Sequence, residues 1–162
     1  MSSTTNFEIR SPSRQELPAV ALLAAKMVRV HHSFDPDRFF ITEAIEPGYE
    51  RFLASELQNP QAVLLAAYLD GRVVGYAYGR IEPRDWAMLL DTHGALHDLF
   101  VDESARGQGI GRRLVTEAVR RLESLGAPRV VLYAAWPNEG AQRLFESLGF
   151  RRTMVEMTRE KG

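Results

Sequence analysis

The stretch that decides the fold is residues 96–111, which read LHDLFVDESARGQGIG. An apolar, strand-like run leads into a short polar loop, three alternating glycines and an amphipathic helix that begins at Ile110. Glycine lets the backbone approach an anion closely, and a helix start presents unpaired N–H groups at the positive end of its dipole. The stretch therefore predicts a phosphate cradle. The alternative is a simple turn into the helix, which would not require three glycines in five residues.

Two common phosphate-binding patterns are not met by this loop. A Walker loop requires lysine after its last glycine, whereas here Gly109-Ile110-Gly111 is followed by Arg112. A dinucleotide fingerprint counted from Gly107 would need its third glycine one position later than Gly111. Both patterns therefore match this loop only weakly.

The RxxGxG pattern of residues 106–111 lies five residues after a predicted strand that ends at Val101. It resembles the pyrophosphate loop of the GCN5-related N-acetyltransferases. A second pattern, NxxAxxxFxxxGF at residues 138–150, resembles that family's second cofactor motif, which is usually written with tyrosine where Phe145 stands. Both motifs occur in the family's order with a predicted strand between them. The resemblance covers about residues 95–150 and is only general in layout before them.

This resemblance implies that the chain binds coenzyme A and uses acetyl-CoA as the acetyl-donor cosubstrate. The loop would hold the pyrophosphate, and the pantetheine arm would pair with the strand that ends at Val101. A backbone N–H near the end of that strand would point at the acetyl carbonyl, an interaction typically worth about 2.7–4 kcal/mol. Arg112 would contact a phosphate or simply lie on a solvated helix face. The implied cofactor-binding residues are Leu99, Phe100, Val101, Arg106, Gly107, Gln108, Gly109, Ile110, Gly111, Arg112, Asn138 and Phe145.

His97 is the candidate for the general base that removes a proton from the acceptor amine. Several family members have a Glu or His at the place where His97 stands, and an imidazole with an ordinary pKa of about 6.5 suits a general base. A structural, hydrogen-bonded histidine is the alternative. Strand alternation predicts that His97 and Leu99 face one way while Asp98 and Phe100 face the other. Asp98 would bind a cationic amine or cap a neighbouring loop.

The general acid is harder to assign, because the family's usual acid is the tyrosine that Phe145 replaces. Tyr133 is the candidate substitute, with Tyr78 and Tyr76 as further hydroxyls. Otherwise the thiolate leaves unprotonated or through water.

The acceptor pocket is expected to form from two loops, residues 29–46 and 82–94. His31, Glu82 and Trp86 are the residues expected to face the acceptor, with an ordinary exposed loop as the alternative. Adjacent histidines at positions 31 and 32 lack an evident third ligand, so no metal site is expected.

The whole-chain composition predicts one compact N-acetyltransferase domain over residues 1–162. Hydrophobic residues make up 45% of the 162 residues, and 20 Lys and Arg against 21 Asp and Glu leave a net charge of −1, which argues against a nucleic-acid partner. The chain has no cysteine, so a Cys nucleophile and thiolate metal sites are excluded, and a cytoplasmic location is expected. No apolar stretch approaches about 18 residues, so no membrane partner is expected. A homodimer would be typical of the resembled family.

The periodicity predicts strands at 7–10, 62–69, 72–81, 95–101, 129–135 and 153–160, and helices from about 17, at 47–58, at 110–125 and from 138. The expected fold is an α/β acyl-CoA N-acyltransferase fold. It has a mixed, mostly antiparallel sheet, a central parallel strand pair and helices on both faces.

The function predicted is direct transfer of an acetyl group from acetyl-CoA to a primary amine of a small molecule or peptide. The alternative is a non-catalytic coenzyme A-binding sensor or interaction domain, which Phe145 favours. A Rossmann-type nucleotide enzyme is the third hypothesis. The residues expected to form the acceptor pocket carry no motif that identifies the amine.

Overall fold

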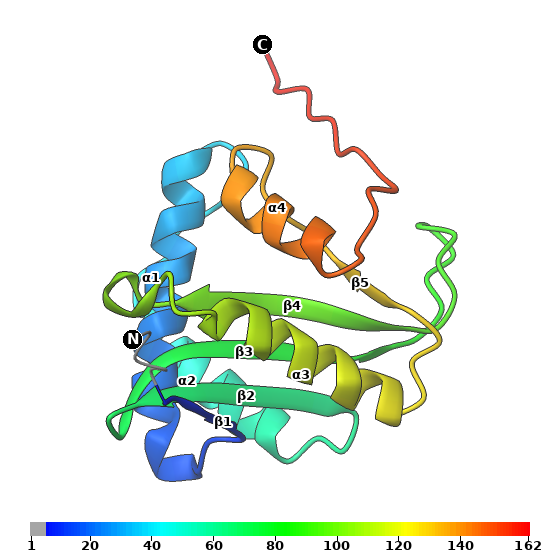
Figure 1. Ribbon diagram of the computed structural model, residues 1–162. Coiled ribbons are helices and arrows are strands. Elements are labelled where there is room, and N and C mark those ends of the chain that lie inside the picture. Colours follow the sequence, from blue (N-terminus) through cyan, green and yellow to red (C-terminus); the bar gives the residue numbers. More distant parts are fainter. Residues whose placement is uncertain (1–5) are drawn as a thin grey trace.

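The computed structural model describes residues 6–162 and is built around one five-stranded sheet (Figure 1). The strands, in spatial order, are β1 (Glu8–Arg10), β2 (Ala62–Leu69), β3 (Arg72–Glu82), β4 (His93–Val101) and β5 (Val130–Leu132). β1 to β4 pair antiparallel, and β4 pairs parallel with β5. This confirms the expected fold class. The parallel pair, however, lies at one edge of the sheet rather than at its centre.

Helices cover both faces of the sheet, as predicted. The helices are α1 (Leu17–Phe34), α2 (Ile45–Leu57), α3 (Ile110–Ser124) and α4 (Glu139–Ser147), with short 3-10 turns at Arg14–Glu16 and Glu103–Ala105. Side chains of α1 and α2 form one core cluster with the sheet, and side chains of α3 and α4 form the other. None of the helices within residues 6–162 has the length and apolarity needed to cross a lipid bilayer.

The turn between β2 and β3 and the start of α3 lie where the sequence predicts them. Asp70 and Gly71 both have positive φ, 50° and 74°, which is the geometry of the two-residue turn that joins strands with a right-handed twist. The turn ends β2 at Leu69, and the bounds of β2, Ala62–Leu69, are those predicted. α3 likewise begins at Ile110, and its predicted stripe supplies the buried residues Ile110, Leu114, Val115, Ala118 and Leu122.

Three expected elements differ from the structure. β5 covers only Val130–Leu132 of the strand expected at 129–135. α1 continues through residues 29–34, which were expected to be loop, and stops where Asp35 becomes extended before Pro36. A residue before proline disfavours helical backbone, so the proline sets the end of the helix. The expected strand at 153–160 is wrong, because residues 151–162 have no regular structure and every one of them is exposed. A strand needs a neighbouring strand edge, which a local pattern of alternation does not supply.

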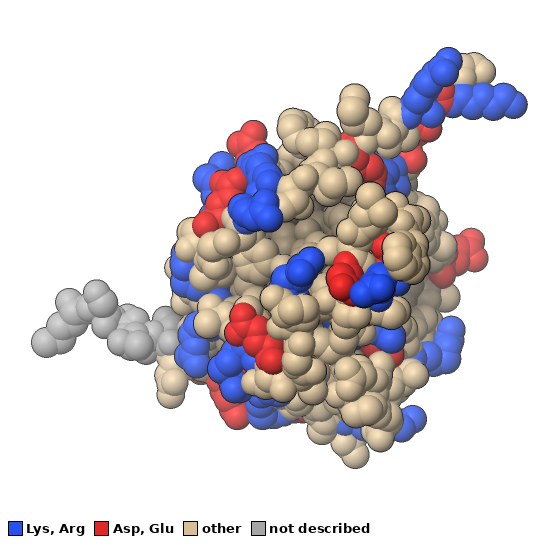
Figure 2. Space-filling view, turned by 90° about the vertical axis from the view of Figure 1, so that its right-hand side faces the viewer, with Lys and Arg blue, Asp and Glu red and all other residues tan. Residues whose placement is uncertain are grey.

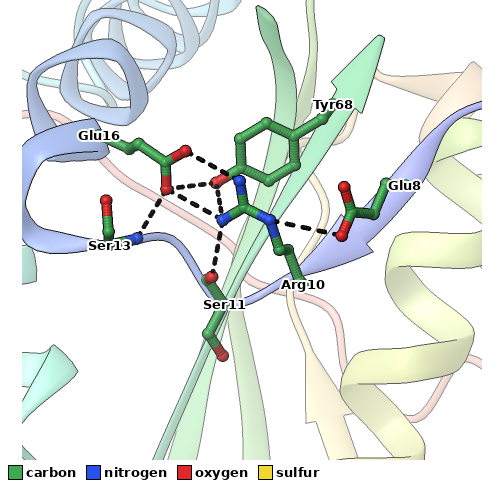
Figure 3. Close-up of polar contacts among 6 residues, drawn as sticks. All are labelled: Glu8, Arg10, Ser11, Ser13, Glu16 and Tyr68. Atoms are coloured by element: carbon green, nitrogen blue, oxygen red, sulfur yellow. Dashed lines mark hydrogen bonds and ion pairs between the residues drawn. The ribbon is translucent and has the colours of Figure 1, made fainter. Parts of the chain in front are cut away.

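A polar cluster fixes the start of α1 against the sheet (Figure 3). Arg10 of β1 donates two hydrogen bonds to Glu16, of 2.9 and 3.0 Å, and its guanidinium lies 3.8 Å from the centre of the Tyr68 ring. The Tyr68 hydroxyl and the Ser13 backbone N–H also donate to Glu16, at 2.9 and 2.7 Å. The spacing of Ser13 and Glu16 predicts such a capping arrangement. The cluster joins β1 and β2 to the beginning of α1.

The cluster makes stability depend on pH. The Arg10 guanidinium, followed by the Ser13 N–H, holds the pKa of Glu16 well below its usual value of 4.5. A carboxyl group with a lowered pKa stabilises the fold above that usual value, and the contribution is lost as pH falls below it. We expect Glu16→Gln to lower Tm near pH 7 by about 2–4 °C and to flatten the loss of Tm toward about pH 3. Calorimetry over a pH series measures the Tm decrease and the pH dependence, and the variant of the exposed Glu50, Glu50→Gln, is the control. An equal loss of Tm in acid for wild type and Glu16→Gln would contradict the role of Glu16.

Candidate active site

A bulge in β4 determines which side chains reach the candidate site. Tyr78 of β3 lies opposite Asp98, but the next residue, Gly79, lies opposite Leu96, so His97 is an extra residue in β4. Strict alternation would send His97 and Asp98 to opposite faces. That expectation is wrong, because the extra residue resets the alternation and both side chains line one cavity.

The cavity lies between α2 and the middle strands of the sheet and has a volume of about 500 Å³. It is lined by Gly48, Tyr49 and Phe52 from α2, Tyr78, Arg80 and Glu82 from β3, and His97 and Asp98 from β4. The aromatic rings form a continuous wall: Phe52 meets Tyr78 edge to face at 5.3 Å, and Tyr78 stacks on His97 at 5.7 Å between ring centres. This size and mixture of aromatic and charged groups suit a small organic ligand.

Glu82 orients the His97 ring. The Nε2 atom of His97 lies 2.9 Å from Oε1 of Glu82. A carboxylate only accepts hydrogen bonds, so a neutral His97 must carry its proton on Nε2 and donate it to Glu82. The lone pair of the imidazole is then on Nδ1. Glu82 therefore lines the cavity, as expected, but it also fixes the tautomer in which His97 can accept a proton.

Arg80 and Glu56 complete the charged part of the site and were not anticipated from the sequence. Arg80 lies between two carboxylates, 3.3 Å from Glu82 and 3.5 Å from Glu56. The buried Glu56 accepts a hydrogen bond from the Tyr78 hydroxyl. Burial, and then that bond, raise the pKa of Tyr78 well above its usual range. The spacing of Tyr78, Arg80 and Glu82 places them on one face of β3, a signal present in the sequence, whereas Glu56 comes from α2.

Asp98 is a largely buried carboxyl group that faces the cavity. The Tyr76 hydroxyl donates a hydrogen bond of 2.9 Å to its Oδ2. Burial nevertheless raises the pKa of Asp98, because removal of water disfavours the charged form. Asp98 therefore does not cap a loop. It is placed to meet a ligand in the cavity, and a positive group there would favour its ionised form.

The glycine loop lies at the end of β4 and leads into α3. Gly107 and Gly109 have φ of 77° and 82°, a region open mainly to glycine, and the space beside both is empty. Within residues 6–162, the N–H groups of Gly107, Gln108 and Gly109 donate to no backbone carbonyl, and the buried Oε1 of Gln108 has no partner. The first N–H groups of α3 are unpaired as well, as at any helix start. The loop therefore has the form of an anion cradle.

Two arginines near the loop are held by protein contacts. The Nε of Arg106 donates to the Val101 carbonyl at 2.9 Å, which closes the loop onto the end of β4. Arg112 donates to the Ser147 hydroxyl at 2.7 Å and so joins α3 to α4.

β4 has a free backbone edge beside the cavity. The pairing of β4 with β5 ends at Leu96 and Leu132, whereas β4 continues to Val101. Among the described residues, no strand pairs with positions 97–101 on this side. An extended ligand could therefore hydrogen-bond to the backbone of Leu99 or Val101 in the manner of an added strand.

Four other predicted site residues lie elsewhere. Tyr133 follows β5 and is 70% exposed, and Trp86 is 74% exposed beneath Arg84; neither lines the cavity. His31 lies on α1, where its Nδ1 is 2.9 Å from the Met27 carbonyl. Phe145 is a core residue packed edge to face against Phe150, with ring centres 6.0 Å apart. The positions of these four side chains depend on how the helices and strands pack together, which the local sequence does not specify.

Asn138 acts as the predicted helix cap. Its Oδ1 accepts a hydrogen bond of 3.2 Å from the Ala141 N–H at the start of α4. The cap ends the connection from β5 and sets the direction of α4 against the core.

Comparison with known proteins agrees with this geometry. The family model described as "Acetyltransferase (GNAT) family" matches residues 27–150. The chain belongs to this family. Among curated relatives, mycothiol acetyltransferase of Thermomonospora curvata is 38% identical over 96 residues, which cover 59% of this chain. That of Acidothermus cellulolyticus is 29% identical over 80% of this chain. The chain matches only 30% and 34% of the lengths of these two relatives.

Two solved structures share the fold of this chain. The BH1408 protein of Bacillus halodurans, a tetramutant, has a TM-score of 0.78 at 24% identity, covering 95% of this chain and 99% of its own. The aminoglycoside N-acetyltransferase AAC(6')-Iy in complex with CoA also has a TM-score of 0.78, at 19% identity, covering 99% of this GNAT chain and 98% of its own.

Proposed function

We propose that this GNAT chain transfers the acetyl group of acetyl-CoA to a primary amine of a small molecule or peptide, by direct attack in a ternary complex. The observation that carries the proposal is the course of β4. Its bulge turns His97 into the cavity beside Asp98, and its far end leads through the 3-10 turn at Glu103–Ala105 into the open glycine loop. One strand thus connects an anion cradle, a free backbone edge and a proton acceptor.

Acetyl-CoA would bind at the glycine loop and along the free edge of β4. The N–H groups from Gly107 to Gly111 and the dipole of α3 would hold the pyrophosphate. The pantetheine arm would lie along residues 97–101, with an N–H of Leu99, Phe100 or Val101 at the acetyl carbonyl. Bound acetyl-CoA supplies an activated thioester. The empty space beside Gly107 and Gly109 and the free edge of β4 fit such a ligand.

The acceptor side is assigned to the cavity. Nδ1 of His97 takes a proton from the incoming ammonium group, directly or through one water, and Glu82 stabilises the resulting imidazolium. The neutral nitrogen forms a bond to the acetyl carbon, the carbon–sulfur bond breaks, and its electron pair goes to sulfur. Phe145 has no hydroxyl and Tyr133 lies outside the cavity, while the hydroxyls of Tyr76 and Tyr78 already donate to Asp98 and Glu56. The proton that the new amide nitrogen loses therefore passes through water to the thiolate.

A coenzyme A-binding sensor remains the second candidate, and Phe145 is the residue that favours it. Calorimetry with acetyl-CoA, followed by a thiol-release assay over small amines, polyamines, amino acids and peptides, separates the two. Turnover of any amine above background supports the enzyme. Tight binding without turnover of any of them supports the sensor, and the absence of binding rejects both.

Asp98 is expected to bind the ammonium group of a cationic acceptor. Asp98→Asn keeps the shape and removes the charge, so KM for that acceptor should rise by about 10–100-fold while kcat changes much less. Because burial raises the pKa of Asp98, wild-type KM should increase as acid neutralises the group, whereas the variant should show no such increase from this residue. Steady-state kinetics over a pH series measures both, with exposed Asp91→Asn as the control. An unchanged KM would remove Asp98 from the acceptor site.

A further inference from the structure

The cavity between α2 and the sheet contains three hydrogen-bond acceptor atoms that no residue within 6–162 uses. They are Oδ1 of Asp98, the hydroxyl oxygen of Tyr49 and Nδ1 of His97. Burial, and then the charge of the nearby Asp98, raise the pKa of Tyr49 above its usual value. A primary ammonium group has three N–H bonds, so it can supply one donor to each of these atoms.

Asp98 is the carboxylate in this site that has no cationic partner within the described part of the chain. Glu82 lies 3.3 Å from Arg80 and accepts the N–H of His97. Glu56 lies 3.5 Å from the same Arg80. Because two carboxylates share this one guanidinium, an added anion would be repelled by them. The site therefore has a place for one cation and none for a carboxylate of the ligand.

The aromatic wall of the cavity is only partly covered by the protein. Tyr49 meets Phe52 edge to face with ring centres 6.4 Å apart, and Phe52 meets Tyr78 in the same way. Phe52 nevertheless remains 43% exposed. A ligand ring placed against Phe52 would bury this apolar surface and would add one more edge-to-face or offset-stacked contact, the arrangements that aromatic pairs prefer.

Gly48 leaves open space in the cavity. It lies near the start of α2, its φ is not positive, and a Cβ added to it would meet no atom within 4 Å. Glycine weakens a helix relative to alanine, and neither backbone conformation nor packing within residues 6–162 requires it at this position. A ligand group that occupies the space beside Gly48 would explain why no side chain fills it.

The outer surface contributes little to the choice of ligand. On the face shown in Figure 2, Lys and Arg side chains are interspersed with Asp and Glu side chains, and uncharged groups lie between them. The net charge of the chain is −1. Such a mixed surface gives little long-range attraction for one sign of charge. Selection of a charged ligand therefore depends on the groups inside the cavity.

We propose that the cavity binds a primary amine that is joined by a short chain to an aromatic ring and carries no carboxylate, and that this amine is the acceptor. Its ammonium group would donate to Asp98, Tyr49 and His97, and its ring would lie beside Gly48 against Phe52. Tyr49 would select primary amines, because a secondary amine lacks the third N–H bond. The role of acceptor rests on the proposed acetyl transfer, whereas the binding does not.

Calorimetric titration of the full chain without acetyl-CoA tests the ligand class. Phenethylamine should bind at least about tenfold more tightly than phenylalanine, which adds a carboxylate, N-methylphenethylamine, which lacks one N–H bond, and putrescine, which lacks the ring. Equal binding of phenylalanine or putrescine, or no binding of phenethylamine, would overturn the proposal. Binding of phenethylamine without turnover of any amine would reject only the acetyl transfer, and turnover of other amines without this binding would do the reverse.

Gly48→Leu tests where the ring lies. Leucine favours a helix and would fill the open space without meeting the protein, so Tm should not fall while the affinity for phenethylamine drops at least about tenfold. Gly140→Leu is the matched control, since Gly140 also lies near the start of a helix, α4, with no atom within 4 Å of an added Cβ. It should bind phenethylamine like wild type. Wild-type affinity in Gly48→Leu would place the amine outside the cavity and overturn the proposal.

Tyr49→Phe tests the selection of primary amines, because it keeps the ring and removes only the hydroxyl. The affinity for phenethylamine should fall about tenfold. N-methylphenethylamine should lose much less, since its methyl group would displace the bond to the neutral hydroxyl rather than the stronger bond to the Asp98 carboxylate. The same calorimetric titrations measure both affinities. An equal loss for the two amines, as a structural role of Tyr49 would give, would overturn its assignment to the ligand site.

Discussion

Gly109→Glu is expected to weaken acetyl-CoA binding by at least about a hundredfold. Two physical effects act together. Gly109 has φ of 82° at the position just before α3, where any other residue is strained. The new carboxylate would also stand where the pyrophosphate is expected, so two negative groups would share one cradle. Calorimetric titration of acetyl-CoA measures the loss directly.

Gly126→Glu is the matched control for that variant. Gly126 has φ of 98°, has no neighbouring atom within 4 Å of an added Cβ, and lies just beyond the opposite end of α3. It therefore carries similar backbone strain and the same new charge, away from the proposed cradle. Both variants should lose similar stability, but only Gly109→Glu should lose acetyl-CoA. Equal affinities in the two variants would reject the loop as the pyrophosphate site.

The parts of the fold that sequence predicted well are those fixed by local chemistry. Asp70-Gly71 specifies a two-residue turn without reference to anything distant, and the buried stripe of α3 follows from helical spacing alone. The glycine loop is similar, because positive φ at Gly107 and Gly109 is a property of the residues themselves. The proposed donor site rests on these same local features.

The cavity depends on relations between distant segments, which one sequence does not reveal. His97 reaches it only because β4 has an extra residue relative to β3, and that register is set by the whole pair of strands. Glu56 reaches the Tyr78 hydroxyl because α2 packs on the sheet. The strand-like pattern of residues 153–158 was visible in the sequence, but the presence of a neighbour for it was not. Alternation therefore gave the wrong facing for His97, and it predicted a strand that the described chain does not form.

His97→Ala is expected to lower kcat by about 10²–10⁴-fold while acetyl-CoA affinity stays close to that of wild type. The imidazole is the group in the cavity whose tautomer leaves a nitrogen free to accept the proton of the acceptor. Without it, the ammonium group must lose its proton to solvent before it can attack. The rate of the wild type should therefore rise with pH in an acidic limb that the variant lacks. A thiol-release assay over a pH series measures kcat, and calorimetry measures the affinity for acetyl-CoA.

His97→Gln distinguishes a general base from a structural histidine. Glutamine can still donate an N–H to Glu82 and fill much of the same space, but its amide cannot accept a proton at neutral pH. If His97 acts as the base, His97→Gln should be as slow as His97→Ala. Glu82→Gln should lose only about tenfold, because the amide oxygen still orients Nε2 while the charge that stabilises the imidazolium is gone. A His97→Gln variant with near wild-type kcat would assign His97 a purely structural role and transfer the proton step to another group.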